Sequence, residues 1–146
     1  MRITTEVREV TPGELAWFTK CAIDGFARAF APAFQRMRLP PLYESGIYFA
    51  FEPNHGSGLE DFSTPLETLE RGCGDCDDLV IYRLCELYAP RVTFQKVKGG
   101  GSVPFQVDTS PACCSCEWVG ESMHVQVRFK NGTLEDPAVL LGAPCP

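Results

Sequence analysis

Five consecutive residues, Gly74 to Asp78, constrain the fold of this chain more than any other feature. The glycine favours a turn, Asp75 is a residue type preferred at helix N-caps, and Asp78 stands where a reciprocal capping box needs a carboxylate. An apolar stripe at helical spacing follows: Val80, Leu84, Leu87 and Tyr88. We therefore predict a helix that begins after Asp75 and places Cys76 at its first position. The unpaired N–H groups and the positive dipole end of such a helix favour an anionic thiolate.

A strand and a turn further along the chain carry a histidine and an aspartate. Residues 123–129 alternate between apolar and polar, with His124 on the polar face. Asn131-Gly132 then signals a hairpin turn. If three residues form the loop, Asp136 becomes the diagonal neighbour of His124, about 7–8 Å away at the backbone. A two-residue turn would instead put Asp136 on the opposite face. Cys76, His124 and Asp136 are thus a candidate nucleophile, base and orienting residue.

The order of these residues, the run Gly-Asp-Cys-Asp-Asp and the later Asp-Pro pair resemble the transglutaminase-like cysteine peptidases. The closest resemblance is to small stand-alone members that are common in bacteriophage and prophage genomes, and it runs from about Asp61 to about Gly142. It implies an α+β fold with a papain-like core, in which the helix bearing Cys76 packs on a mostly antiparallel sheet bearing His124 and Asp136. It also implies that Cys76 is the nucleophile, that His124 is the general base and acid, and that Asp136 orients the imidazole.

The reaction implied by this resemblance is acyl transfer from a peptide or isopeptide carbonyl through a thioester on the cysteine. Water would release the acyl group as an acid, whereas a primary amine would give transamidation, and the residues leave both outcomes open. The backbone N–H of Cys76 is a natural donor to the oxyanion. No cofactor is expected for this chemistry, and the expected partner is a protein or peptide substrate.

Size and charge narrow the class of protein. At 146 residues the chain is expected to form one domain, with an N-terminal helical part (residues 1–44) and a catalytic core (residues 45–146). Thirteen basic and nineteen acidic residues give a net charge of −6, which argues against nucleic acid and anionic membranes as partners. The first residues lack an apolar segment of signal-peptide length, so we expect a cytoplasmic protein, in the host cytoplasm if a phage encodes it.

The rest of the sequence predicts one long helix and several short strands. Thr11-Pro12-Gly13-Glu14 is typical of a helix start with a capping box, and the helix should run toward Met37, with Pro32 ending or kinking it. Its predicted core stripe is Leu15, Phe18, Ala22, Phe26, Ala29 and Ala33. Strands are predicted over residues 46–51, 92–97 and 103–107, the last at a sheet edge because it contains Pro104.

The eight cysteines keep a second class of site open. Cys73 and Cys76 form one CxxC pair, and Cys113 and Cys116 form another, as in four-thiolate zinc sites, although the interval between the pairs is long for a zinc ribbon. A metal site on Cys113, Cys114 and Cys116 that spares Cys76 would be compatible with catalysis. Cys73 and Cys76 could also join in a disulfide that switches the nucleophile off.

Two further alternatives concern the catalytic residues themselves. The carboxylates beside Cys76 would disfavour its thiolate unless they face the helix N–H groups and solvent, while His124 supplies a positive partner. His55, in a turn-rich loop, is the other histidine that could serve as the base. A chain with this fold could also be a catalytically silent binding module associated with a virion.

Overall fold

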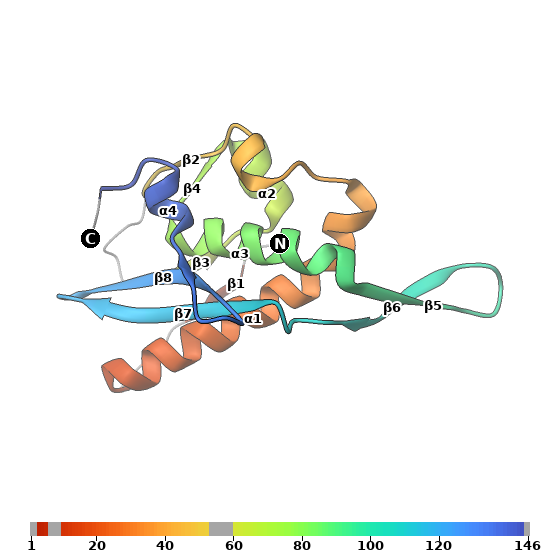
Figure 1. The fold of residues 1–146 in the computed structure, drawn as a ribbon, viewed down its shortest axis with the longest axis horizontal. Coiled ribbons are helices and arrows are strands. Elements are labelled where there is room, and N and C mark those ends of the chain that lie inside the picture. The colour runs from red at the N-terminus through yellow and green to blue at the C-terminus, as the bar shows by residue number, and fades with distance from the viewer. Residues whose placement is uncertain (1–2, 6–9, 53–59, 145–146) are drawn as a thin grey trace.

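The computed structural model describes residues 3–5, 10–52 and 60–144, which form an α+β fold (Figure 1). The described α-helices are α1 (Pro12–Met37), α2 (Pro65–Arg71), α3 (Cys76–Tyr88) and α4 (Pro137–Leu140), and two 3-10 turns are η1 (Leu42–Glu44) and η2 (Ala89–Arg91). The described strands are β1 (Ile3–Thr5), β2 (Tyr48–Phe49), β3 (Glu60–Phe62), β4 (Cys73–Gly74), β5 (Val92–Lys96), β6 (Ser102–Val107), β7 (Ala112–Val119), β8 (Ser122–Phe129) and β9 (Leu134–Glu135). Within the described ranges, no helix is both long and apolar enough to cross a membrane.

Helix α1 begins where the sequence predicts, because Thr11 and Glu14 form the expected capping box. The Thr11 hydroxyl accepts a hydrogen bond from the Glu14 N–H at 3.2 Å, and the Glu14 carboxylate accepts one from the Thr11 N–H at 2.8 Å. The helix continues through Pro32 to Met37, so the prediction that Pro32 could end it is wrong. Pro32 cannot donate a helix hydrogen bond, and it lies buried on the core side of the helix.

The face of α1 that packs in the core differs from the predicted stripe. The most buried residues of the helix are Thr19, Ile23, Ala27, Ala31, Pro32 and Phe34. Phe18 is 37% exposed, and Ala29 and Ala33 are also exposed. Ala22 and Phe26 of the predicted stripe do pack against the core, partly buried, but the centre of the core face lies about one residue, or about 100° around the helix, from the prediction.

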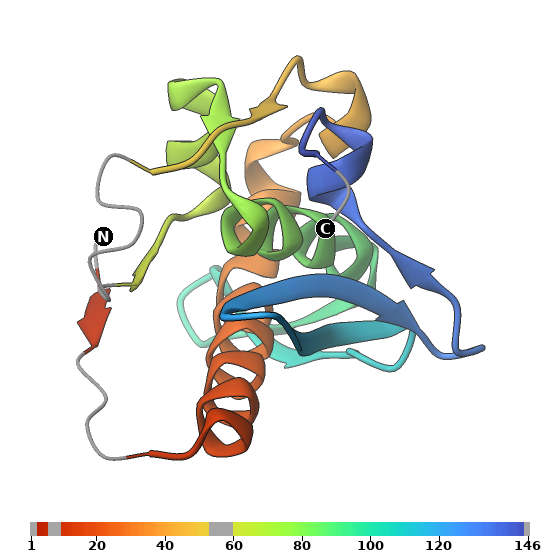
Figure 2. The same cartoon turned by 90° about the vertical axis from the view of Figure 1, so that its left-hand side faces the viewer.

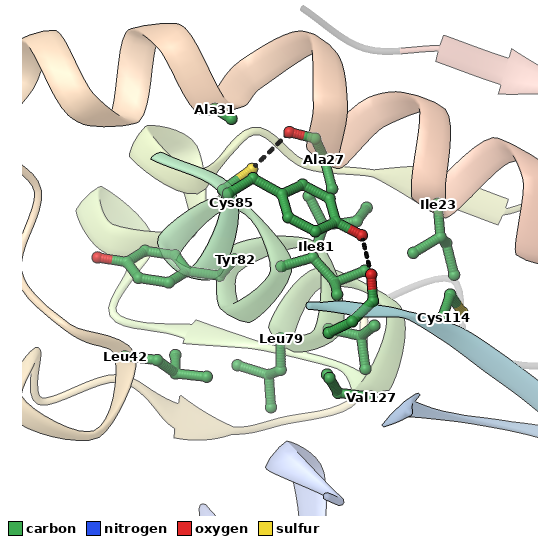
Figure 3. Close-up of a cluster of buried hydrophobic side chains, with 14 of the residues drawn as sticks. Ile23, Ala27, Ala31, Leu42, Leu79, Ile81, Tyr82, Cys85, Cys114 and Val127 are labelled. Atoms are coloured by element: carbon green, nitrogen blue, oxygen red, sulfur yellow. Dashed lines mark hydrogen bonds between the residues drawn. The ribbon is translucent and has the colours of Figure 1, made fainter. Parts of the chain in front are cut away.

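Helix α3 is the centre of the core, and it begins at Cys76 with Asp75 as the N-cap, as predicted. Its fully buried apolar residues are Leu79, Val80, Ile81, Tyr82, Leu84, Cys85 and Tyr88. The Cys85 thiol donates to the Ala27 carbonyl of α1 (Sγ to O, 3.4 Å), and the Tyr88 hydroxyl donates to the Ala112 carbonyl of β7 (2.6 Å; Figure 3). A helix that is apolar around most of its circumference needs partners on several sides, and α1 and the sheet supply them.

The sheet that bears the predicted histidine is antiparallel and has the order β7-β8-β9. Cys114 pairs with Val127 and Cys116 with Val125, and this face packs against the two long helices, α1 over β7 and α3 over β8 (Figures 1 and 2). The β5–β6 hairpin projects from one end of the molecule (Figure 1). Strands β1 and β3 form a small antiparallel pair, and β2 and β4 form a parallel one.

The predicted strands are confirmed to different degrees. The segments predicted over residues 92–97, 103–107 and 123–129 correspond to β5, β6 and β8. In the segment predicted over residues 46–51, the strand is β2, where two residues pair with β4. Strand β7 and helix α2 were not predicted.

Candidate active site

The β8–β9 hairpin brings His124 and Asp136 together. The Phe129 N–H donates to the Thr133 carbonyl at 2.8 Å, and Gly132 has a φ of 88°, so the loop contains three residues. Gly132 occupies a left-handed conformation that glycine adopts without steric cost. Val127 pairs with Glu135, which places Asp136 opposite Gln126 and diagonal to His124. The longer of the two turns considered from the sequence is therefore the correct one.

Three contacts fix the carboxylate of Asp136. Its Oδ2 lies 2.6 Å from His124 Nε2 and accepts a hydrogen bond from the Gln126 side-chain amide at 3.3 Å. Its Oδ1 accepts from the Val139 N–H at 3.1 Å, so Asp136 is also the N-cap of α4. The side chains of His124 and Asp136 are only 13% and 16% exposed. Because Nε2 is held by the carboxylate, Nδ1 is the ring nitrogen placed to exchange a proton.

Cys76 occupies the first position of α3 and is partly buried. Helix α3 packs over β8, and the two elements begin at the same end of the molecule (Figure 1). Val125 and Val127 of β8 are buried in the core with α3, and His124 alternates with them, so its side chain leaves the opposite face of the strand. The His124 ring contacts the Asp136 carboxylate through Nε2. The structure thus brings His124 and Asp136 together, and it places Cys76 at the start of the helix that packs against the other face of β8.

The carboxylates around Cys76 have distinct structural roles. Asp75 accepts from the Asp78 N–H at 3.4 Å, as an N-cap does, and the Asp77 carboxylate accepts from the same N–H at 2.8 Å. Asp78 does not complete a capping box. Its Oδ1 instead accepts from the Ser63 N–H at 2.8 Å, and its Oδ2 pairs with the Arg71 guanidinium at 2.5 Å. Asp75 and Asp77 both face a helix N–H group, as expected, but Asp77 and Asp78 are buried and do not face solvent.

Burial reduces the negative charge that these groups place near the thiol. Burial, with a further contribution from the neighbouring Asp75 carboxylate, raises the pKa of Asp77 well above its ordinary value. The same two causes raise the pKa of Asp78 to about 6, although Arg71 and the Ser63 N–H act against the shift. A protonated Asp77 beside Cys76 is compatible with a thiolate, so the electrostatic objection raised by the sequence is weaker in the folded chain.

The backbone that leads to Cys76 is held by two close approaches. Arg71, besides pairing with Asp78, donates from Nε to the Cys73 carbonyl at 2.9 Å. A Cβ on Gly74 would lie 2.9 Å from Asp78 Cβ and 3.1 Å from Thr68 Cγ2, so no side chain fits at this position. Both contacts are unrelated to the thiol itself. The residues around the cysteine therefore shape the start of the helix, whatever the thiol does.

Gln126 and Arg71 also belong to the site, and neither is predicted from the sequence. Gln126 could have been found, because it lies two residues from His124 on the same strand face and the three-residue turn puts it opposite Asp136. No local pattern connects Arg71 to Asp78, since the contact depends on the packing of α2 against α3. His55, the alternative base, lies outside the described residues.

The structure gives the four-thiolate metal site no geometric support. Cys113 and Cys116 lie three residues apart on β7, so their side chains leave opposite faces of the strand. Within the described part of the chain, the side chains close enough to share an ion are instead the carboxylates of Glu52, Asp75 and Asp78, whose oxygens lie within 4.8 Å of one another. Burial and the charges of Asp75 and Asp78 raise the pKa of Glu52 to about 7, which is what crowding of carboxylates produces.

No protein-family model matches this chain, and comparison with curated proteins and with solved structures gave no match.

Proposed function

We propose that this chain is a transglutaminase-like cysteine hydrolase or acyltransferase that acts on a peptide or isopeptide amide, with Cys76, His124 and Asp136 as its catalytic residues. The observation that carries the proposal is the contact of 2.6 Å between His124 Nε2 and Asp136 Oδ2. A partly buried carboxylate on one ring nitrogen fixes the tautomer and leaves the other nitrogen for proton transfer, which is the arrangement that nucleophilic catalysis by a thiol needs.

In the proposed reaction, the Cys76 thiolate attacks the carbonyl carbon of the amide. The backbone N–H of Cys76, at the start of α3, stabilises the oxyanion. His124 then donates a proton from Nδ1 to the departing amine, and a thioester remains on Cys76. Water or a second amine, activated by the same nitrogen, releases the acyl group. Asp136 holds the ring throughout, and Gln126 holds Asp136.

The proposal requires the Cys76 thiol and the His124 ring to come within hydrogen-bond distance when substrate binds. Catalytic hydrogen bonds are often longer before substrate binds and shorten in the complex. The resemblance noted in the sequence supports the papain-like arrangement, because its motif residues fall at the start of α3, on β8 and directly after β9. A catalytic thiol must stay reduced, which is consistent with a cytoplasmic location.

The test is the pH dependence of alkylation at Cys76 by iodoacetamide, read by mass spectrometry of the tryptic peptide over residues 72–83. Cys73 lies in the same peptide and serves as the internal reference. We expect Cys76 to react well below the pH set by an ordinary thiol pKa of about 8.5. This reactivity should disappear in His124→Ala, fall in Asp136→Asn and persist in His55→Ala.

Three outcomes would contradict the proposal or redirect it. Equal reactivity of Cys73 and Cys76 in the wild type would remove the activated thiol. Loss of reactivity in His55→Ala, with His124→Ala unaffected, would assign the base to His55. Protection of both thiols that only a chelator relieves would indicate a metal site. Far-UV circular dichroism of each variant separates these results from unfolding.

A further inference from the structure

Strand β7 carries three cysteines that the proposed reaction does not use: Cys113, Cys114 and Cys116. Cys114 and Cys116 lie two residues apart and share the face of β7 that packs toward α1, where their sulfur atoms are 3.6 Å apart. Cys113 leaves the opposite face of the strand. Cys114 is fully buried beside Ile23 (Figure 3), whereas Cys116 is only partly buried and is accessible to a small solute.

The surroundings of the pair distinguish the two thiols. The Cys114 N–H donates to Asp24 Oδ1 of α1 at 2.6 Å, and Lys20 pairs with the same carboxylate at 2.5 Å. The two sulfur atoms share a hydrogen bond in which either can be the donor, and this contact lowers the pKa of Cys116, whereas burial acts against the shift. The same hydrogen bond, together with burial, raises the pKa of Cys114. Cys116 is the more exposed of the two thiols and the one whose pKa is lowered, so it is the sulfur placed to react with an oxidant from solution.

We propose that Cys114 and Cys116 form a redox-active dithiol, which hydrogen peroxide converts into a disulfide within β7. The Cys116 thiolate attacks one peroxide oxygen, which breaks the O–O bond and gives a sulfenic acid, and the hydroxide that leaves is protonated to water. The Cys114 sulfur then attacks the sulfenic sulfur. An S–S bond forms, and the second hydroxide leaves with the Cys114 proton as water. Two thiols are oxidised by two electrons in total, and one peroxide is reduced to two waters.

The position of the pair on one strand makes the disulfide reversible. Residues two apart on a β-strand have Cα atoms about 6.7 Å apart, near the upper end of the separations that disulfides span. A strained disulfide is more easily reduced than a relaxed one, so a dithiol reductant regenerates the pair. This proposal concerns neither Cys76 nor His124, and it stands or falls independently of the proposed function.

The experiment is differential alkylation of the full chain after exposure to increasing hydrogen peroxide. Free thiols are blocked with iodoacetamide under denaturing conditions, disulfides are then reduced, and the released thiols are labelled with N-ethylmaleimide and located by fragmentation. We expect Cys114 and Cys116 to acquire the second label together and before any other cysteine, and to lose it when dithiothreitol precedes the first block. In Cys116→Ser, the label on Cys114 should fall about tenfold, because the sulfur atom that lies 3.6 Å from Cys114 and would pair with it is gone.

Cys113→Ser is the matched control, since it changes the adjacent residue on the opposite face and should leave the pair unaffected. Cys85, which is buried and bonded to a backbone carbonyl, should stay reduced. The proposal fails if peroxide converts Cys116 to a sulfinic acid while Cys114 remains a free thiol, or if Cys113 or exposed Cys21 forms the first disulfide. The wild-type measurement decides the question even if a variant does not fold.

Discussion

The start of α3 and the β8–β9 hairpin both position residues of the candidate site, but by different physical means. In the hairpin, a three-residue turn sets the register, and the register alone places Asp136 diagonal to His124. At the start of α3, the backbone around Cys76 depends on a buried carboxylate, Asp78, which contacts Ser63 and Arg71 from preceding segments. A site held by local geometry should lose little stability when one of its side chains changes, whereas a site held by a buried, hydrogen-bonded carboxylate should lose much.

Replacing Asp78 with Ala tests this contrast most strongly. The change removes the acceptor of the buried Ser63 N–H and leaves space in the core beside Thr68 and Gly74. Leaving a buried donor unsatisfied and opening space in the core together cost about 3 kcal/mol of unfolding free energy, although Arg71 can return to water. Urea unfolding measures the loss. Glu70→Ala, an exposed change on α2, is the control and should stay within about 0.5 kcal/mol of wild type.

The pH dependence of the unfolding free energy shows whether the charge on Asp78 stabilises or destabilises the folded chain. Burial, with the Asp75 charge, raises the folded-state pKa of Asp78 to about 6 from an ordinary value of 3.8. The folded chain therefore binds the extra proton more tightly than the unfolded chain does. The resulting stabilisation is complete below about pH 3.8 and is lost as the pH rises through about 6. Asp78→Asn should flatten this part of the stability curve, and an unchanged slope would mean that another carboxyl group titrates there.

Gly74→Ala should have the next largest effect. The new Cβ would lie 2.9 Å from Asp78 Cβ and 3.1 Å from Thr68 Cγ2, and neither atom is the end of a flexible side chain. Overpacking of this kind costs about 2 kcal/mol. Gly25→Ala, inside α1 with no atom within 4 Å of the new Cβ, is the matched control and should stabilise the chain by about 0.5–1 kcal/mol. Thermal denaturation of the two variants compares them, and equal melting temperatures would contradict the close approach at Gly74.

The sequence predicted the parts of the fold that depend on neighbouring residues. Three features each depend on a few adjacent side chains: the capping box at Thr11, the start of α3 at Cys76 and the hairpin loop that ends at Gly132. The start of α2 carries the same Thr-Pro-x-Glu pattern as α1, with Thr64 and Glu67 in a capping box, and could have been predicted in the same way.

The parts that were missed depend on tertiary contacts. The core face of α1 was misplaced because small residues occur around the whole helix, and only contact with α3 selects Ala27 and Ala31. Strand β7 was missed because a run of cysteines and serine has no clear alternation. Its burial alternates only over residues 112–115, where Ala112 and Cys114 are buried and their neighbours are partly exposed. The contact between Arg71 and Asp78 joins two helices and leaves no local signature.

Substitutions of Asp136 have the smallest expected effect on stability, and they distinguish the two roles of this residue in the hairpin. Its Oδ1 caps α4 through the Val139 N–H, and its Oδ2 contacts His124. Asp136→Ala removes both contacts and should cost about 1 kcal/mol, mainly from the lost cap, whereas Asp136→Asn keeps a good capping oxygen and should cost less than about 0.5 kcal/mol. Urea unfolding compares the pair. If both variants lose the same stability, the contact with His124 rather than the cap holds α4 in place. The turn would then depend on the site it positions, and the contrast with the start of α3 would disappear.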